Sequence, residues 1–175
     1  MHSDLQIQER KAMSNLLILG AGQFGIMVKE IAESTKKFDR IDFLDDANPI
    51  AIDKLENYVS FVSDYEYAVV AIGNPMARQK YLDGLMQCYK IATVVSPLAY
   101  VSPSAVIGEG SIIEPMAVIQ TGATVGNGCI VSSGAVVRHN ANVGNYSHLD
   151  CNSVVCSNSA VEDGTKIQIC EICRD

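Results

Sequence analysis

The sequence lacks the features that direct a chain to a membrane, to export or to nucleic acid. No apolar run approaches the ~20 residues that are needed to cross a bilayer. The first fifteen residues carry charges such as Asp4 and Lys11 and include no apolar stretch of a secretory signal. The net charge is −7 without a basic stretch, which argues against nucleic acid and anionic membranes as partners. We therefore expect a cytoplasmic protein whose six cysteines are reduced thiols.

Charged and aromatic residues become scarce after residue 94. Residues 95–175 contain only two aromatic side chains, Tyr100 and Tyr146, but eight of the thirteen glycines. Two different architectures therefore share the chain. We predict a flexible N-terminus over residues 1–13, an α/β domain over residues 14–94 and a repetitive domain over residues 95–175.

The repetitive domain has a period of six residues. Counting by six from residue 95 to residue 167 gives thirteen positions, all of which hold Val, Ile or Leu. The residue four positions later is small in twelve of these thirteen hexads. This pattern predicts short strands with inward aliphatic side chains and corners where Gly and Asn tolerate positive φ. The corner residues include Gly108, Gly110, Gly126, Asn127, Gly128, Gly144 and Asn145. Three hexads close one triangular coil of eighteen residues. One stacked aliphatic column should then contain Val95, Ile113, Val131, Leu149 and Ile167.

These hexads resemble those of the hexapeptide-repeat acyltransferases. The resemblance implies a left-handed parallel β-helix, a hand that the period alone does not reveal. Thirteen repeats make a little over four coils, and the family usually has more, so we expect a β-helix that is short at its C-terminal end. A purely structural solenoid is the alternative that the repeat itself leaves open.

The preceding domain has the pattern of a Rossmann-like nucleotide-binding α/β unit. A strand over residues 16–19 ends in a GxGxxG turn at residues 20–25, and a helical pattern follows. Such a turn lets the backbone approach a phosphate at the N-terminus of the helix. A glycine turn that only packs the helix on the strand is the structural alternative.

Two further strands accompany this turn. A strand over residues 40–44 ends in Asp45 and Asp46, close to the spacing of a ribose-binding acid. A strand over residues 67–72 ends at Gly73, and a helix from Met76 to about Tyr89 follows. The unit is half of a full dinucleotide fold, so a mononucleotide ligand suits it better than NAD.

The two domains together resemble the bacterial nucleotide-sugar acetyltransferases of the sialic-acid O-acetyltransferase and UDP-4-amino-sugar N-acetyltransferase types. The local matches include residues 20–25, 43–46, 71–74 with Arg78, and 134–139. The resemblance implies transfer of acetyl from acetyl-CoA to an amino or hydroxyl group of a nucleotide-linked sugar, most of all a UDP-sugar, in bacterial surface-glycan biosynthesis. It also implies a homotrimer with acetyl-CoA between neighbouring β-helices.

The resemblance also assigns site residues. The nucleotide sugar would contact Gly22, Gln23, Phe24, Asp45, Asp46 and Gly73. His139 would be the catalytic base and His148 would meet acetyl-CoA. An imidazole can accept the proton that an amine or hydroxyl loses as it attacks a thioester. The sequence departs from the family at Phe24, where a histidine is common, and at Asn140, where an acid usually follows the base. We expect Asn140 to orient the His139 ring, with Asp150 as the alternative partner.

Other functions would need other residues. A catalytic zinc site takes three imidazoles, and only His139 and His148 remain once His2 is set aside, so we expect no metal. Cys170 and Cys173 form a lone CxxC without a second pair, as expected of exposed tail thiols. Two functional alternatives stay open. One is a trimeric nucleotide-sugar-binding protein without acetyl transfer, and the other is an NAD-dependent protein.

Overall fold

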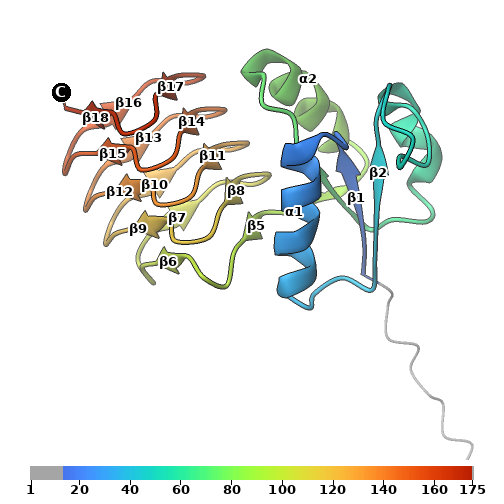
Figure 1. The fold of residues 1–175 in the computed structure, drawn as a ribbon, viewed down its shortest axis with the longest axis horizontal. Coiled ribbons are helices and arrows are strands. Elements are labelled where there is room, and N and C mark those ends of the chain that lie inside the picture. The colour runs from blue at the N-terminus through green and yellow to red at the C-terminus, as the bar shows by residue number, and fades with distance from the viewer. Residues whose placement is uncertain (1–13, 175) are drawn as a thin grey trace, which may run out of the picture.

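The computed structural model describes residues 14–174, which form two units side by side (Figure 1). The expected flexible N-terminus, residues 1–13 with His2, lies outside the described residues. An α/β unit comes first and a three-sided stack of short strands follows. The elements of the α/β unit are β1 (Asn15–Leu19), α1 (Gln23–Ser34), β2 (Arg40–Leu44), the 3-10 helix η1 (Leu55–Phe61), β3 (Tyr67–Val70), α2 (Pro75–Leu85) and β4 (Lys90–Ile91).

The α/β unit is built on a parallel sheet with the strand order β2-β1-β3-β4. Strand β1 is buried along its whole length, and its side chains alternate between two cores. Leu16 and Ile18 pack with residues of α1 on one face, whereas Leu17 and Leu19 pack with residues of α2 on the other. The strand order reverses between β1 and β3, and sheets of this kind bind ligands at the carboxyl ends of the strands beside such a point.

Two of the predicted elements end earlier than expected. The strand predicted over residues 67–72 ends at Val70, because the carbonyls of residues 72 and 73 accept hydrogen bonds from Arg78 instead of continuing a ladder. The helix predicted to reach Tyr89 ends at Leu85. The chain turns there because the Tyr89 side chain is buried, and its hydroxyl donates to the carbonyl of Tyr58 at 2.6 Å.

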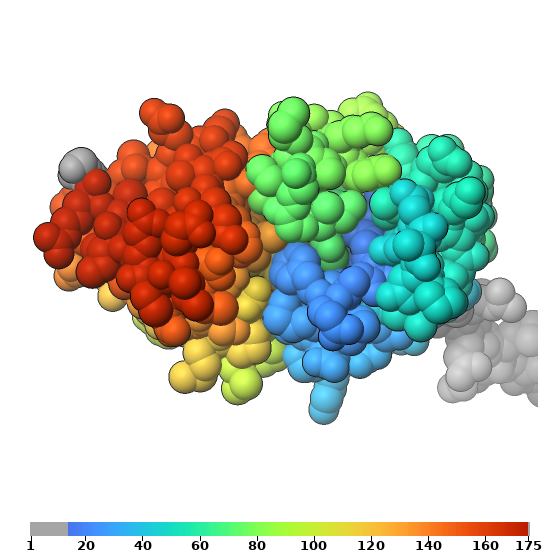
Figure 2. All heavy atoms as spheres, turned by 45° about the horizontal axis from the view of Figure 1, so that its top comes forward, coloured from blue at the N-terminus to red at the C-terminus, as the bar shows by residue number. Residues whose placement is uncertain are grey.

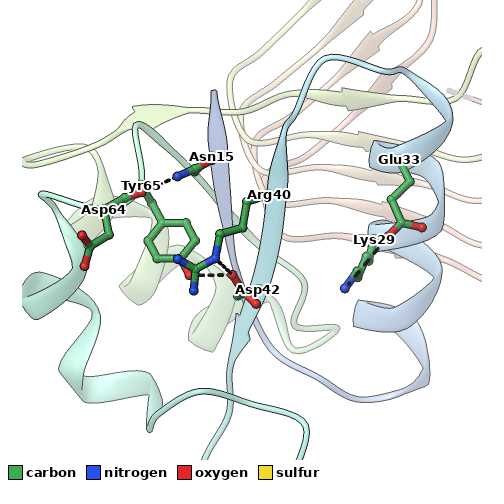
Figure 3. A network of polar contacts seen from close by, with 7 residues as sticks. All are labelled: Asn15, Lys29, Glu33, Arg40, Asp42, Asp64 and Tyr65. Atoms are coloured by element: carbon green, nitrogen blue, oxygen red, sulfur yellow. Dashed lines mark hydrogen bonds and ion pairs between the residues drawn. The ribbon is translucent and has the colours of Figure 1, made fainter. Parts of the chain in front are cut away.

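A polar network joins the amino ends of the strands (Figure 3). Asp42 Oδ2 accepts from the Tyr65 hydroxyl at 2.6 Å and from Arg40 Nε at 2.5 Å. Burial and the bond to Asp42 raise the pKa of Tyr65, so the hydroxyl stays protonated and donates. Asn15 Nδ2 donates to the carbonyl of Asp64 at 2.7 Å. This network holds the segment before β3 against β1 and β2, at the end of the sheet opposite the glycine turn.

The second unit is a left-handed parallel β-helix, as the repeat and its resemblance predict. Its strands form three parallel sheets: a first face with the order β17-β14-β11-β8-β5, a second face with β18-β15-β12-β9-β6 and a third face with β16-β13-β10-β7. The strands are β5 (Val94–Val95), β6 (Tyr100–Val101), β7 (Val106–Ile107), β8 (Ile112–Ile113), β9 (Val118–Ile119), β10 (Thr124–Val125), β11 (Ile130–Val131), β12 (Val136–Val137), β13 (Asn142–Val143), β14 (His148–Leu149), β15 (Val154–Val155), β16 (Ala160–Val161), β17 (Lys166–Ile167) and β18 (Ile172–Cys173).

The predicted aliphatic column is present in the first face. Val95 pairs with Ile113, Ile113 with Val131, Val131 with Leu149, and Leu149 with Ile167. Every inward position from Ile113 to Ile167 is buried in one core that also contains the alanines of the corners. Burial of each such aliphatic side chain contributes about 1.5–3 kcal/mol.

The corners differ from the prediction in one respect. A residue with positive φ recurs every six positions from residue 110 to residue 170, and several of these residues are not glycine. Of the predicted corner residues, Gly110 and Gly128 adopt positive φ as expected, whereas Asn127 and Asn145 do not. Gly108, Gly126 and Gly144 do not adopt it either, contrary to expectation. They are stacked one above another, and a Cβ at Gly126 would lie 2.7 Å from the backbone nitrogen of Asn145 in the next coil. Close stacking of the coils therefore excludes a side chain at these positions.

The two units share part of a core. Val94 and Ile112 point outward from the first face of the β-helix and are buried together with residues of α1. The first face therefore turns toward the α/β unit, and Figure 1 shows the second face on the side away from α1. The corner between the second and third faces, which contains residues 138–141 and their equivalents in the other coils, lies opposite the first face. We call this corner the distal edge.

Candidate functional site

A hollow lies at the carboxyl ends of the strands of the α/β unit. Figure 2 shows it between the blue residues at the start of α1, the green residues around α2 and the cyan residues that follow β2. The glycine turn after β1 and the loop after β3 border this hollow, at the point where the strand order reverses. We call it the crevice.

The glycines at the crevice fall into two kinds. Gly20 has φ of +106°, and a Cβ there would lie 2.6 Å from the carbonyl oxygen of Ala71. A Cβ at Gly25 would overlap the carbonyl oxygen of Gly20, so both glycines are required by the packing of α1 on the sheet. Gly22 and Gly73 differ, because a Cβ at either would meet no atom within 4 Å. The fold does not require glycine at these two positions. A ligand that approaches the backbone would require glycine there.

The start of α1 offers unsatisfied hydrogen-bond donors. Ile26 donates to the carbonyl of Gly22, and the helix has no side-chain cap and no acid in its first turn. The N–H groups of Gln23, Phe24 and Gly25 have no acceptor among residues 14–174. Free N–H groups and the positive end of the helix dipole favour an anion. Gln23 is exposed, whereas Phe24 is half-buried and packs on the core beneath the turn.

Asp45 supports the glycine turn. Its Oδ2 accepts from the N–H of Ala21 at 2.8 Å, and its Oδ1 accepts from the N–H groups of Ala47 and Asn48, each at 2.9 Å. These bonds, with that from Ala21 first, hold the pKa of Asp45 below its usual value. The predicted ribose-binding carboxylate is therefore already engaged with the backbone. Asp46 is exposed beside it and accepts from the N–H of Leu55 at 3.1 Å.

His139 lies on the distal edge, and its exposed side chain projects outward as its hexad position predicts. Its N–H donates to Gln120 Oε1 at 3.1 Å, and its ring has no hydrogen-bond partner among residues 14–174. The distal edge faces away from the α/β unit of the same chain. The structure therefore does not bring His139 to the crevice within one chain.

Asn140 occupies a corner with φ of +59°. Its Nδ2 lies 3.4 Å from Oδ1 of Asn158 in the next coil, and no bond joins its side chain to His139. Asp150, the alternative partner, lies at the corner between the first and second faces and pairs with Lys166 at 3.0 Å. Both expected partners of the His139 ring are thus engaged elsewhere, because each coil fixes corner side chains against the adjacent coil.

His148 lies on the first face, which turns toward the α/β unit. Its Nε2 is 3.1 Å from the hydroxyl of Ser132 in the coil before. Burial lowers the pKa of His148, the neighbouring Asp150 opposes that shift, and Lys166 adds to it. His148 is therefore a neutral, half-buried imidazole, and it is on a different side of the β-helix from His139.

Arg78 is the residue whose role the sequence did not reveal. It is buried, and it connects the loop after β3 to two corners of the β-helix through four backbone carbonyls. The only signal was its match to the family motif, since an arginine in a helix is ordinarily solvated.

Residues 14–174 contain no group of three or more His, Cys, Asp or Glu side chains that could hold a metal ion. None of their helices is long and apolar enough to cross a membrane. In the same part of the chain no disulfide joins any of the six cysteines, and Cys170 is exposed.

Comparison with known proteins identifies both units. Residues 15–85 match the PglD N-terminal domain, and residues 104–139 match the bacterial transferase hexapeptide (six repeats). The two matches together span more than half of the chain. No curated protein matches it significantly.

Solved structures match the chain over nearly its whole length. The acetyltransferase domain of PglB from Neisseria gonorrhoeae FA1090, in complex with acetyl coenzyme A, is 26% identical with a TM-score of 0.76, over 91% of this chain and 93% of that chain. PerB from Caulobacter crescentus, in complex with CoA and GDP-perosamine, is 19% identical with a TM-score of 0.69, over 92% of each chain. WeeI from Acinetobacter baumannii AYE is 16% identical with a TM-score of 0.61, over 91% and 94%.

A PglD-type domain in front of hexapeptide repeats defines a transferase of the left-handed β-helix class. The chain is similar to nucleotide-sugar acetyltransferases that carry hexapeptide repeats, as the resemblance of its sequence predicts.

Proposed function

We propose that the protein is a cytoplasmic homotrimer that transfers acetyl from acetyl-CoA to an amino or hydroxyl group of a nucleotide-linked sugar in surface-glycan biosynthesis. The similar PglB domain was solved with acetyl coenzyme A, and PerB was solved with CoA and GDP-perosamine. The sequence resemblance favours a UDP-sugar.

The crevice suits the diphosphate of a nucleotide sugar. A ligand in the crevice can approach the backbone at Gly22 and at Gly73, because neither residue carries a side chain. The start of α1 supplies free N–H groups. Gln23 and Asp46 are exposed at its rim and are available to the nucleoside or the sugar. Asp45 acts mainly by holding the turn, through its bond from Ala21.

His139 is the proposed general base. As the sugar amine attacks the thioester carbonyl, the amine proton passes to the imidazole, and the new C–N bond forms before the C–S bond breaks. The CoA thiolate then leaves and takes the proton back from the imidazolium. The exposed ring of His139 has no partner among the described residues, so it is open to a substrate from outside its own chain. His148 remains the proposed contact for acetyl-CoA.

We propose that two copies of the chain share each site, because His139 lies on the distal edge. The crevice lies in the α/β unit, the first face covers that unit, and the distal edge faces away from it. A second copy must therefore supply His139 to the crevice of the first. In a ring of three copies each crevice would receive one such edge, which gives three equivalent sites.

The second face supplies a surface for this assembly. Its outward side chains form a column of one tyrosine and four aliphatic residues: Tyr100, Val118, Val136, Val154 and Ile172. Tyr100 and Ile172 at its two ends are 57% and 52% exposed, and the three valines between them are partly exposed. A continuous apolar stripe of this kind indicates a protein interface.

Subunit mixing tests the shared site. A Gly22→Ala chain keeps the base and loses the crevice, whereas a His139→Ala chain keeps the crevice and loses the base. When the two inactive variants are unfolded, mixed in equal amounts and refolded, about a quarter of the sites should combine two intact halves. Acetyl transfer should recover to about that fraction, and each variant refolded alone is the control. No recovery in trimers of mixed composition would place the whole site in one chain.

The substrate is tested by mass spectrometry with acetyl-CoA and a panel of UDP- and GDP-linked amino sugars, together with their hydroxyl analogues. A mass gain of one acetyl group identifies the acceptor and distinguishes N- from O-acetylation. Tight binding of a nucleotide sugar without any acetyl gain would favour the alternative, a trimeric binding protein. Binding of NAD in place of a nucleotide sugar would overturn both.

A further inference from the structure

Arg78 is a buried cation without a carboxylate partner. Its side chain is 1% exposed, and no ion pair joins it to an acid in residues 14–174. Burial lowers its pKa, but a guanidinium starts so far above neutrality that it stays charged. A charge in this position is stable only if hydrogen bonds satisfy it. In this protein the Arg78 guanidinium donates all of its hydrogen bonds to backbone carbonyls.

The four bonds join three separate segments. Arg78 Nη1 donates to the carbonyls of Ile72 and Gly73 at 2.9 and 2.8 Å. Its Nε donates to the carbonyl of Gly128 at 2.6 Å, and its Nη2 donates to the carbonyl of Tyr146. Arg78 therefore fixes the loop that borders the crevice to two stacked corners of the β-helix.

These bonds also set the direction of two peptide groups at the crevice. All peptide bonds of the described chain are trans, so each N–H points opposite to the carbonyl of the same peptide. With the carbonyls of Ile72 and Gly73 directed at Arg78, the N–H groups of Gly73 and Asn74 point away from it. Neither N–H has an acceptor among residues 14–174. The open side of Gly73 has no atom within 4 Å of a Cβ position, so a ligand can reach them.

We infer that Arg78 is a positioning residue for the diphosphate of the nucleotide sugar. It turns the N–H groups of Gly73 and Asn74 toward the crevice, opposite the free N–H groups of α1, and it polarises both peptides with its charge. It does not touch the ligand itself. Consecutive backbone N–H groups held in this way form a concave anion site. The inference rests on the proposed function, because it assumes that the crevice holds a diphosphate.

Tyr146→Phe provides a matched control. The Tyr146 hydroxyl donates to Asp83 of α2 at 2.9 Å, so it also joins α2 to the β-helix. It makes no contact with the carbonyls of the loop after β3. The backbone carbonyl that Arg78 uses at this residue remains in the variant. A defect that arises merely from loosening the two units should therefore appear in Tyr146→Phe as well.

The test measures binding of UDP, GDP and inorganic pyrophosphate by calorimetry, and KM for the nucleotide sugar and for acetyl-CoA, in Arg78→Gln and Arg78→Lys. Arg78→Gln should weaken nucleoside diphosphate binding about 10- to 100-fold, since hydrogen bonds to a charged group are lost. Arg78→Lys should give an intermediate loss, because it keeps the charge with fewer directed donors. KM for acetyl-CoA and binding by Tyr146→Phe should change less than about 3-fold, below the effect of one hydrogen bond.

Each result decides the inference. The inference is overturned if Arg78→Gln is folded by circular dichroism and binds UDP as tightly as the wild type. It is also overturned if Tyr146→Phe loses as much UDP affinity as Arg78→Gln. If Arg78→Gln does not fold, the comparison of Arg78→Lys with Tyr146→Phe decides by the same criterion. A wild type that binds no nucleoside diphosphate refutes the proposed function, and the inference with it. Normal wild-type catalysis with unaffected arginine variants refutes the inference alone.

Discussion

The glycines of the turn after β1 should separate into residues that the fold needs and residues that the ligand needs. Gly22 has φ of −67° and ψ of −178°, which alanine adopts without strain, and its Cβ would meet no atom within 4 Å. The poorer N-cap quality of alanine costs a few tenths of a kcal/mol to about 1 kcal/mol, and the stiffer unfolded chain offsets about 0.4–1 kcal/mol. Gly22→Ala should therefore change the free energy of unfolding by less than about 1 kcal/mol.

The same methyl group should obstruct a diphosphate. It would occupy open space at the N-cap of α1, directly before the residues whose N–H groups are free. Loss of two hydrogen bonds to a charged group, at about 1.5 kcal/mol each, corresponds to roughly 100-fold weaker binding. Calorimetric titration with UDP measures this loss. Acetyl-CoA binding by the same variant is the control and should not change.

Gly25→Ala should behave in the opposite way. Its Cβ would overlap the carbonyl oxygen of Gly20, so α1 must shift away from the sheet. Overpacking of this kind costs about 1–3 kcal/mol, which urea denaturation measures. If folded Gly22→Ala binds UDP as tightly as the wild type, the turn only packs helix on strand and the crevice is not the nucleotide site.

Three further predictions concern the β-helix. His139→Ala should reduce turnover by about 10²–10⁴-fold with little change in KM for the nucleotide sugar, and full activity in this variant would refute the assignment of the base. The wild type should lose stability as the pH falls below about 6.5, because burial lowers the pKa of folded His148 and the unfolded chain binds the proton more readily. Denaturation curves of His148→Asn should show less of this loss, and an identical pH dependence would contradict it. Val136→Lys should convert the proposed trimer into a folded monomer near 18.9 kDa by light scattering, whereas Val136→Thr should keep the assembly of the wild type. A lysine variant with the wild-type assembly would exclude the second face as the interface.

The β-helix was predictable because its packing repeats. Every coil places position 95, 113, 131, 149 or 167 in the same column, so the requirement for an aliphatic side chain returns every eighteen residues. The corners were less predictable. Closure of the coil imposes positive φ on Met116, Tyr146 and Cys170, which carry no sequence signal for it. The stacked glycines serve close approach between coils instead, a contact that involves residues eighteen positions apart.

In the α/β unit, the sequence spacing of residues predicts the fold better than it predicts the role of each side chain. The glycine turn and its strands follow from local pattern, and Gly20 and Gly25 have the packing roles expected of them. Asp45 has the spacing of a ribose-binding acid, but both of its oxygens accept backbone N–H groups. A carboxylate that supports a turn and one that binds a ribose look alike in sequence. The hydrogen bonds show that Asp45 supports the turn, and its contact with the nucleotide sugar stays a prediction.

The proposed division of the site between two copies follows from how the chain enters the β-helix. It passes from β4 into β5 of the first face, so that face is the one that the α/β unit covers, through Val94 and Ile112. The edge opposite this face is then the only edge of the prism that the unit cannot approach. His139 stands on that edge because it is the third residue of its hexad on the second face. If this histidine lay six residues earlier or later in the sequence, it would lie at a corner of the first face. The same period that builds the core thus directs the proposed base away from its own crevice, which is why the proposed site needs a second copy.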